Sequence, residues 1–453
     1  MVELKHIFSP FVILTIVFEI VMMIIYGTWI EYDTEYTPGE TEDPQVANTY
    51  KFYSDVAVMI LIGFGYLMTF LKKYGYSAAG FTFFISCLTF QWAIVTNAFF
   101  HQVYTSFGKF AIEIPSIVEG MYATAAVLIT FGAILGKTTP LQLIIVAFFE
   151  MIFYSLNIYV NIYQLKAIDV GGSMIIHAFG AFFGISLTRV LTSKLQTKSH
   201  NDSGSVYTSD IFSLIGTIWL WLYWPSFNGA LAMPGAQFRA FMNTFLSLTA
   251  SVLTTFFVSH ILRGGKFDMV DIQNATLAGG VAVGTTADLF IYPVGALSCG
   301  VAGGLVSTLG FAYFAPKIEK FFGVQDTCGV QFLHGWPGIV GGLAGVIATK
   351  IANEHPSRYL AERSFHAFFH RGGDQPEIQL AALGITLGIA IFGGLFTGFI
   401  LKLGTQNALN PFNDSEFWEV PQEFGKEPQQ DSFPDPSDSK WVDYNPSDGE
   451  QMI

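Results

Sequence analysis

Two stretches of the sequence decide the fold: DVGGSMIIHAFG at residues 169–180 and DTCGVQFLHGWPG at residues 326–338. Each stretch reads aspartate, seven residues, histidine, and each begins an apolar segment. Five predicted membrane spans separate the equivalent positions, and an odd separation inverts the second copy relative to the first. Inverted repeats of this kind bring equivalent residues of the two halves together near the bilayer midplane. The two stretches therefore predict a membrane protein built from two inverted halves, with its two histidines facing each other.

The composition is that of a chain surrounded mostly by lipid. Apolar residues make up 51% of the 453 residues and charged residues only 13%, whereas about 25% of the residues of a soluble domain are charged. Apolar stretches long enough to cross about 30 Å of hydrocarbon as helices recur along nearly the whole chain. We predict an all-α polytopic membrane protein with twelve spans, near residues 9–29, 53–71, 79–99, 114–136, 139–161, 171–190, 210–228, 241–262, 272–291, 294–314, 331–350 and 378–402.

A change of composition near residue 405 divides the chain into two predicted domains. Residues 1–404 form the transmembrane domain, with the inverted repeats at about 51–190 and 208–350. Residues 405–453 hold eleven acidic residues against two lysines, together with many Pro, Gln and Ser residues. Such a composition predicts a mostly disordered acidic tail, which could dock a cytoplasmic partner. The net charge of -13 comes largely from this tail and is not the basic surface that nucleic-acid binding needs.

Lysine and arginine residues orient the predicted spans. The side of the membrane that holds both termini carries fourteen of them and the other side carries eight. Because cytoplasmic loops are the richer in these residues, we predict that both termini are cytoplasmic.

The two histidines, His177 and His334, are candidate pore residues. Eight residues of helix advance about 12 Å, which carries each histidine toward the bilayer centre while Asp169 and Asp326 stay at the helix starts. A histidine bonded to backbone in the core is the alternative, but ionisable groups inside a membrane usually mark substrate or proton pathways. For the aspartates we predict helix capping, and a role in recruiting cations would come in addition to it.

Further motifs accompany these stretches: GFGYLMTFL at 63–71, WPSFN at 224–228, QNATLAGGVAVG at 273–284 and DTCG at 326–329. At these residues the chain closely resembles the Rh glycoproteins, a branch of the ammonium transporter, methylammonium permease and Rhesus family. The resemblance covers about residues 10–425, and the extra first span points to the Rh branch. It implies the ammonium-transporter fold, with two inverted five-helix repeats plus an extra N-terminal and a C-terminal helix.

The resemblance also implies a site and its substrate. It implies a plasma-membrane homotrimer in which each subunit has an apolar pore for ammonia or ammonium, lined by His177 and His334 below an aromatic gate. Phe227 matches one gate position. The other is Tyr122, where relatives usually have phenylalanine, so this chain adds a hydroxyl to the gate. Methylammonium and carbon dioxide stay open as further substrates, and no cofactor is implied.

Elementary chemistry favours passage of neutral ammonia. An ion loses far more solvation energy than a neutral molecule on entering an apolar tube. The sequence suggests that His177 and His334 are the only ionisable groups of the span interiors near the pore. Ammonium would then be recruited and deprotonated at the outer mouth. The alternatives are an electrogenic transporter with the histidine pair as proton relay, and a non-conducting structural protein. The sequence has no motif for a nucleophile, a phosphate loop or a metal cluster, and we expect no enzymatic activity.

Overall fold

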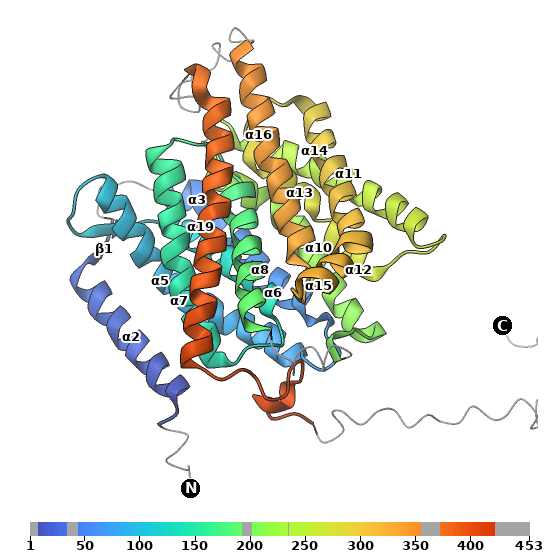
Figure 1. The fold of residues 1–453 in the computed structure, drawn as a ribbon. Helices are drawn as coiled ribbons and strands as arrows, with labels where there is room; N and C mark the ends of the chain where they lie inside the picture. Colours follow the sequence, from blue (N-terminus) through green and yellow to red (C-terminus); the bar gives the residue numbers. More distant parts are fainter. Residues whose placement is uncertain (1–7, 34–43, 193–201, 234, 355–371, 422–453) are drawn as a thin grey trace, which may run out of the picture. The chain divides into compact units, whose positions relative to one another are not determined.

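The computed structural model describes residues 8–33, 44–192, 202–233, 235–354 and 372–421. One compact unit runs from Met1 to Trp418, and its described part is a bundle of long helices (Figure 1). In that part, ten helices are long and apolar enough to cross a membrane. They are Pro10–Thr28 (α2), Asn48–Phe70 (α3, η1, α4 and η2), Gly75–Tyr104 (α5), Ile114–Ile134 (α6), Pro140–Gln164 (α7 and η3), Ser173–Leu191 (η4 and α8), Gln237–Leu262 (α11), Tyr292–Phe322 (α14, η7 and α15), Gln331–Glu354 (η8 and α16) and Gln375–Gly404 (α19).

Two further helical segments occupy the remaining predicted spans. α10, Tyr207–Gly229, carries Asp210 in its first turn and a proline near its end. The other segment is broken into α12 (Met269–Ala275), α13 (Ala278–Val283) and the short 3₁₀ turn η6 (Gly284–Thr286). All twelve predicted spans therefore fall on helices, and the predicted fold class is confirmed.

Several long spans change from α-helix to a wider π-helical turn along their length. α3 (Pro44–Val58) continues into η1 (Met59–Gly63), α7 (Pro140–Ile158) into η3 (Tyr159–Gln164), and α14 (Tyr292–Leu309) into η7 (Gly310–Phe314). Short pieces complete two of the spans: α4 (Phe64–Leu67), η2 (Met68–Phe70) and α15 (Ala315–Phe322). Such π-turns are uncommon and frequently occur at functional sites.

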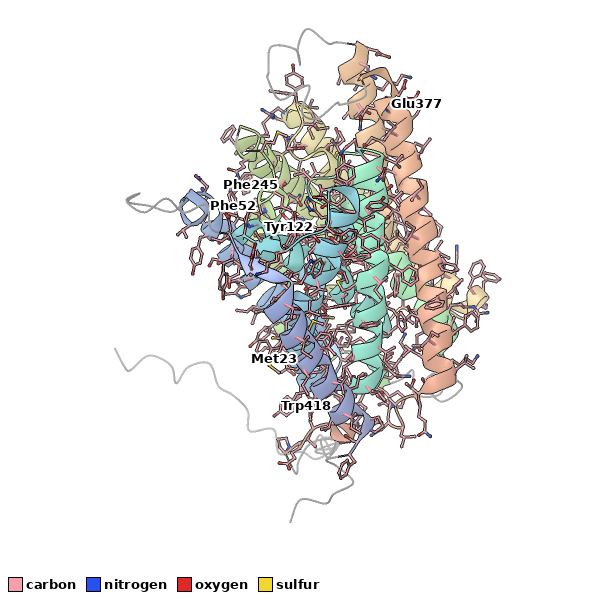
Figure 2. The ribbon with its side chains drawn as sticks, turned by 90° about the vertical axis from the view of Figure 1, so that its left-hand side faces the viewer. Met23, Phe52, Tyr122, Phe245, Glu377 and Trp418 are labelled. Carbon is pink, nitrogen blue, oxygen red and sulfur yellow. The ribbon has the colours of Figure 1, made fainter. Side chains whose placement is uncertain are left out.

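The first helix, α2, lies at the edge of the bundle, where Figure 2 shows Met23 on it. Met22 is its one buried side chain, so most of α2 faces the surroundings of the bundle. The Ser9 hydroxyl caps the helix start and Pro10 occupies the first position, as expected for an N-terminus. Glu19, a carboxylate in the middle of this apolar helix, accepts a hydrogen bond of 3.2 Å from Gln91 Nε2 on α5. A side-chain amide thus partly compensates for placing this acid in the span.

Two short parallel strands join loops at one end of the bundle. β1, Ile30–Tyr32, follows α2, and β2, Phe110–Ile112, precedes α6. The pairing of Ile30 with Phe110 ties the end of the first span to the start of the fourth. The strands thereby fix where α6 enters the bundle.

Residues 405–418, which we call the C-terminal strap, pack against the opposite end of the unit. Asp414, the first residue of the short turn η10 (Asp414–Glu416), accepts hydrogen bonds of 2.8 Å from the backbone N–H groups of Tyr76 and Ser77 at the start of α5. Phe412 is fully buried, and Trp418 Nε1 donates to the Ser77 hydroxyl at 2.9 Å. Figure 2 shows Trp418 and Glu377 at opposite ends of the bundle. The sequence-based division at residue 404 therefore assigns to the tail a segment that packs on the helical unit; residues 422–453 of the tail lie outside the described residues.

Candidate functional site

Both histidines lie on short π-helical turns that begin a span. His177 belongs to η4, Ser173–Ala178, which continues into α8 (Phe179–Leu191), and His334 belongs to η8, Gln331–Gly335, which continues into α16 (Trp336–Glu354). A glycine precedes each turn: Gly172 has φ 68° and Gly329 has φ 69°. Glycine adopts this left-handed backbone without steric cost, which explains the glycine in both sequence stretches. The two halves thus position their histidines by the same local geometry.

The two aspartates cap these turns. Asp169 Oδ2 accepts hydrogen bonds from the backbone N–H groups of Met174 at 2.9 Å and Ile175 at 2.8 Å. The carboxylate of Asp326 likewise accepts hydrogen bonds from the backbone N–H groups of Val330 at 3.0 Å and Gln331 at 2.9 Å. The first N–H groups of a helix have no partner within it, so these carboxylates fill a need created by the fold. Capping fixes the start of each turn, and with it the height of each histidine.

The environments of the aspartates also affect their acidity. Burial raises the pKa of Asp169 to about 6, although the Thr285 hydroxyl and backbone N–H groups favour its ionised form. Burial likewise raises the pKa of Asp326. The hydrogen bonds of capping therefore lower the pKa of each carboxyl group, against the increase that burial causes.

The two histidine rings meet in the interior of the bundle. Their Nδ1 atoms lie 3.1 Å apart, the ring centroids are 5.2 Å apart, and the rings are nearly parallel at 5°. His177 is fully buried and His334 is 2% exposed. A hydrogen bond between two Nδ1 atoms needs one of them protonated and the other not. His177 Nε2 has no hydrogen-bond partner among the described residues, so one polar edge of the pair is open to a ligand.

Aromatic rings continue from the histidine pair in both directions. Phe227 of α10 lies 5.9 Å from His177 between ring centroids, and Tyr122 of α6 lies 4.4 Å from Phe227. On the other side, Phe64 of α4 stacks on His334 at 6.1 Å. We call these five residues, Tyr122, Phe227, His177, His334 and Phe64, the ring column. The Trp224 ring also stacks on His177, with 5.5 Å between the ring centroids.

A cavity of about 410 Å³ adjoins the Tyr122 end of the ring column. Figure 2 shows Tyr122 within the bundle. Charged residues on the cavity wall are the acids Glu119, Asp169 and Asp288 and one cation, Lys166. Lys166 Nζ donates to the Tyr104 hydroxyl at 2.8 Å. Glu119 lies one helical turn before Tyr122 on α6, and no hydrogen bond or ion pair joins it to another described residue.

Sequence and structure comparisons identify the family. The pattern of the Ammonium Transporter Family matches residues 12–410. The chain belongs to this family. It is similar to Ammonium transporter Rh type B of Danio rerio, with 42% identity over 91% of this chain and 93% of that protein. It is also similar to Ammonium transporter Rh type C of Homo sapiens, with 41% identity over 89% of this chain and 88% of that protein.

A solved structure has the same fold. Nitrosomonas europaea Rh50, from a study of conduction by the Rhesus protein family of channels, superposes with a TM-score of 0.70 and 31% identity. The match covers 84% of this chain and 94% of that chain. The predicted membership of the Rh branch is confirmed by these relatives.

The structure places the two gate residues and the two histidines named in the sequence analysis next to one another. Tyr122, Phe227, His177 and His334 are consecutive members of the ring column. Asp169 caps η4 and also lies on the cavity wall. The carboxylate that caps the helix is therefore also the one that would recruit a cation. Asp326 is not among the residues that line this cavity, and its contacts are those of a cap.

Two acids occupy interior positions of the spans, so the histidines are not the only ionisable groups there, contrary to the expectation from the sequence. One is Glu119 on the cavity wall. The other is Glu150 of α7, which is fully buried. Glu150 Oε1 lies 2.7 Å from the Thr130 hydroxyl of α6, which is also 2.9 Å from the Gly180 carbonyl of α8. In the sequence, the available signal for both residues is an acidic residue within an apolar stretch. Only the packing shows that these side chains face the interior of the bundle.

Lys137 supports the other end of the site. It occupies the turn between α6 and α7 and is 1% exposed. Its ammonium donates to the carbonyl of Ala133 and the hydroxyl of Thr188, both at 2.7 Å, and to the carbonyl of Gln325. Burial lowers the pKa of Lys137 to about 7, and nearby Asp326 opposes that shift. The lysine thereby ties α6 and α8 to the residue just before the Asp326 cap, a role that its loop position in the sequence did not reveal.

Proposed function

We propose that this protein conducts neutral ammonia across a membrane, from the cavity and along the ring column past His177 and His334. The observation that carries the proposal is the buried Nδ1–Nδ1 hydrogen bond of this pair, which leaves both Nε2 edges for a ligand. One imidazole of such a pair has a protonated Nε2 and the other an unprotonated one. The pair therefore offers one donor and one acceptor to a small molecule that can do both, and ammonia is such a molecule.

The surroundings of the pair favour a neutral passenger. Trp224, Phe227 and Phe64 enclose the histidines with aromatic rings and provide no carboxylate beside them. Moving an unpaired ion into such a site costs several kcal/mol or more, whereas neutral ammonia loses only hydrogen bonds to water. Ammonium therefore gives up its proton before it passes the gate formed by Tyr122 and Phe227.

The cavity provides a place for the cation before that step. Glu119 is a carboxylate without a partner among the described residues, one turn from Tyr122, and the cavity wall carries Asp169 and Asp288 as well. A carboxylate in such surroundings is stabilised by a cation, and the Tyr122 ring adds a cation–π attraction. Ammonium held here would raise the local concentration of the species that supplies ammonia.

A second candidate function rests on the same hydrogen bond. A proton shared by two Nδ1 atoms 3.1 Å apart could move between the two imidazoles. Ammonia and a proton would then cross separately, and transport would carry net charge. A non-conducting structural role is the weaker alternative, because it requires neither the paired histidines nor the cavity above them.

Membership of the family supports a proposal for the assembly and location of the protein. We propose a homotrimer with one ring column in each subunit, inserted in the plasma membrane with both termini in the cytoplasm. The position of the strap and the start of α2 at one end of the unit supports termini on one side of the membrane (Figure 1). The relatives are transporters, and the protein is not an enzyme.

Purified protein in liposomes loaded with a pH-sensitive dye tests the proposal. A rapid ammonium gradient should alkalinise these liposomes faster than protein-free liposomes, and a voltage step should leave the rate unchanged. Ammonium-dependent current that the His177→Ala/His334→Ala variant lacks would establish the electrogenic candidate instead. Rates equal to those of protein-free liposomes would contradict conduction. Gradients of methylammonium and carbon dioxide in the same assay decide whether either is a further substrate.

A further inference from the structure

A hydrogen bond ties together the two rings between the cavity and His177. The Tyr122 hydroxyl of α6 donates to the backbone carbonyl of Phe227 on α10. The ring centroids of the two residues are 4.4 Å apart. Tyr122 is 4% exposed and Phe227 is fully buried, so water does not compete readily for this bond. The hydroxyl therefore restrains the Tyr122 ring in its present position.

The Phe227 carbonyl accepts this bond because it lies in the last turn of a helix. α10 ends at Gly229. The last four carbonyls of a helix have no donor within it, so they need one from elsewhere. The Tyr122 hydroxyl supplies that donor from a different helix. The bond consequently joins α6 to the end of α10 at the level of the two rings.

Of the two rings, Tyr122 is the one with room to move. Phe227 is enclosed by the rings of Tyr122, Trp224 and His177. Tyr122 lines the cavity of about 410 Å³, so its ring borders open space on one side. A movement that uncovers His177 from the cavity is therefore a movement of Tyr122, and it breaks the bond to the Phe227 carbonyl.

We propose that the Tyr122 hydroxyl is a latch that holds this gate closed and so sets the rate at which ammonia passes from the cavity to His177. The inference rests on the proposed function, because it takes the ring column as the route. Breaking a neutral buried hydrogen bond that water later replaces lowers an equilibrium by a factor of about 2 to 10. The latched gate is accordingly open about 2- to 10-fold less often than an unlatched one.

The Tyr122→Phe variant removes the hydroxyl and keeps the ring. We expect its ammonia permeability in liposomes to be about 2- to 10-fold higher than that of the unmodified protein. Tyr74→Phe is the matched control, because Tyr74 is a buried tyrosine at the start of α5, outside the ring column and the cavity. Its permeability should stay at the unmodified level. Tyr122→Leu, which removes the ring together with the hydroxyl, provides a second unlatched variant, and its permeability should also exceed that of the unmodified protein.

The outcomes separate a latch from two other roles of the hydroxyl. If Tyr122→Phe melts at a lower temperature but conducts at the unmodified rate, the hydroxyl only caps α10 and the latch is wrong. A slower variant would mean that the hydroxyl helps the passenger across, which also overturns the latch. Both of these results leave the proposed function intact. Failure of the unmodified protein to exceed protein-free liposomes would instead remove the proposed function and the latch together.

Discussion

The Nδ1 atoms of His177 and His334 form a hydrogen bond of 3.1 Å between the two halves of the chain. One donor and one acceptor are needed, so the pair holds a single proton between the two Nδ1 atoms. Replacing either histidine leaves the other with an unpaired ring nitrogen in a buried site. Loss of either histidine therefore removes the hydrogen-bond partner of the other.

The first prediction concerns this pair. His177→Ala and His334→Ala should each leave a folded protein, at a cost of about 1–3 kcal/mol for the unpaired nitrogen, and should change the rate or selectivity of ammonia flux. His260→Ala is the control, because His260 lies at the exposed end of α11 and contacts Phe267. Stopped-flow permeability of the three variants provides the measurement. Unmodified flux and selectivity in both pore variants would exclude the histidines from conduction.

The second prediction concerns Glu119. Glu119→Gln keeps the size of the side chain and removes the charge that would hold ammonium in the cavity. Loss of about 1 kcal/mol of attraction, a modest value for a partly solvated ion pair, corresponds to a roughly fivefold weaker affinity. The ammonium concentration for half-maximal flux should rise by that factor while the maximal rate changes little. Glu377→Gln should alter neither quantity, because Glu377, in the first turn of α19, is not among the residues that line the cavity.

The histidine pair could be predicted from the sequence because symmetry made it visible. Two Asp–His stretches, separated by an odd number of spans, must bring their histidines together if the halves are inverted. The spans were also predictable, since length and hydropathy determine what can cross a bilayer.

Residues whose roles depend on packing were not predictable. Glu150 and Glu119 occupy spans that differ little in sequence from lipid-facing helices, and only tertiary contacts orient them inward. The strap was assigned to the acidic tail because its composition is polar. Its order comes from capping α5 through Asp414 and from burying Phe412, which are long-range contacts that local composition does not encode.

The third prediction concerns the protonation of Glu150. The Thr130 hydroxyl has one proton, yet both Glu150 Oε1 at 2.7 Å and the Gly180 carbonyl at 2.9 Å lie in position to accept it. Both contacts become hydrogen bonds if Glu150 is a neutral acid that donates to Thr130, which in turn donates to Gly180. Glu150→Gln, whose amide can donate in the same way, should therefore fold and conduct normally. Glu150→Ala should lower stability by about 2–5 kcal/mol, the usual cost of truncating a large buried side chain.

Infrared spectroscopy checks the protonation state directly. A neutral carboxylic acid has a carbonyl band apart from those of carboxylates, and the difference spectrum between the unmodified protein and Glu150→Gln should contain it. A difference spectrum with carboxylate bands alone would show that Glu150 is ionised. In that case Thr130 must donate to Glu150, and the Gly180 carbonyl has no donor from this hydroxyl.

The last prediction compares two shortened chains. A chain ending at Trp418 keeps every contact of the C-terminal strap, whereas one ending at Gly404 loses them all. Loss of the buried Phe412 ring alone should cost about 3–5 kcal/mol, and loss of the Asp414 cap of α5 about 0.5–2 kcal/mol more.

Thermal unfolding of the two shortened chains in detergent provides the measurement. The chain ending at Trp418 should melt at the temperature of the full chain, and the chain ending at Gly404 should melt well below it. Asp414→Ala in the full chain is the graded control and should fall between these two, because it removes the bonds to the Tyr76 and Ser77 N–H groups and leaves Phe412 buried under Gly136. Equal melting temperatures for both shortened chains would mean that the strap contacts contribute no net stability.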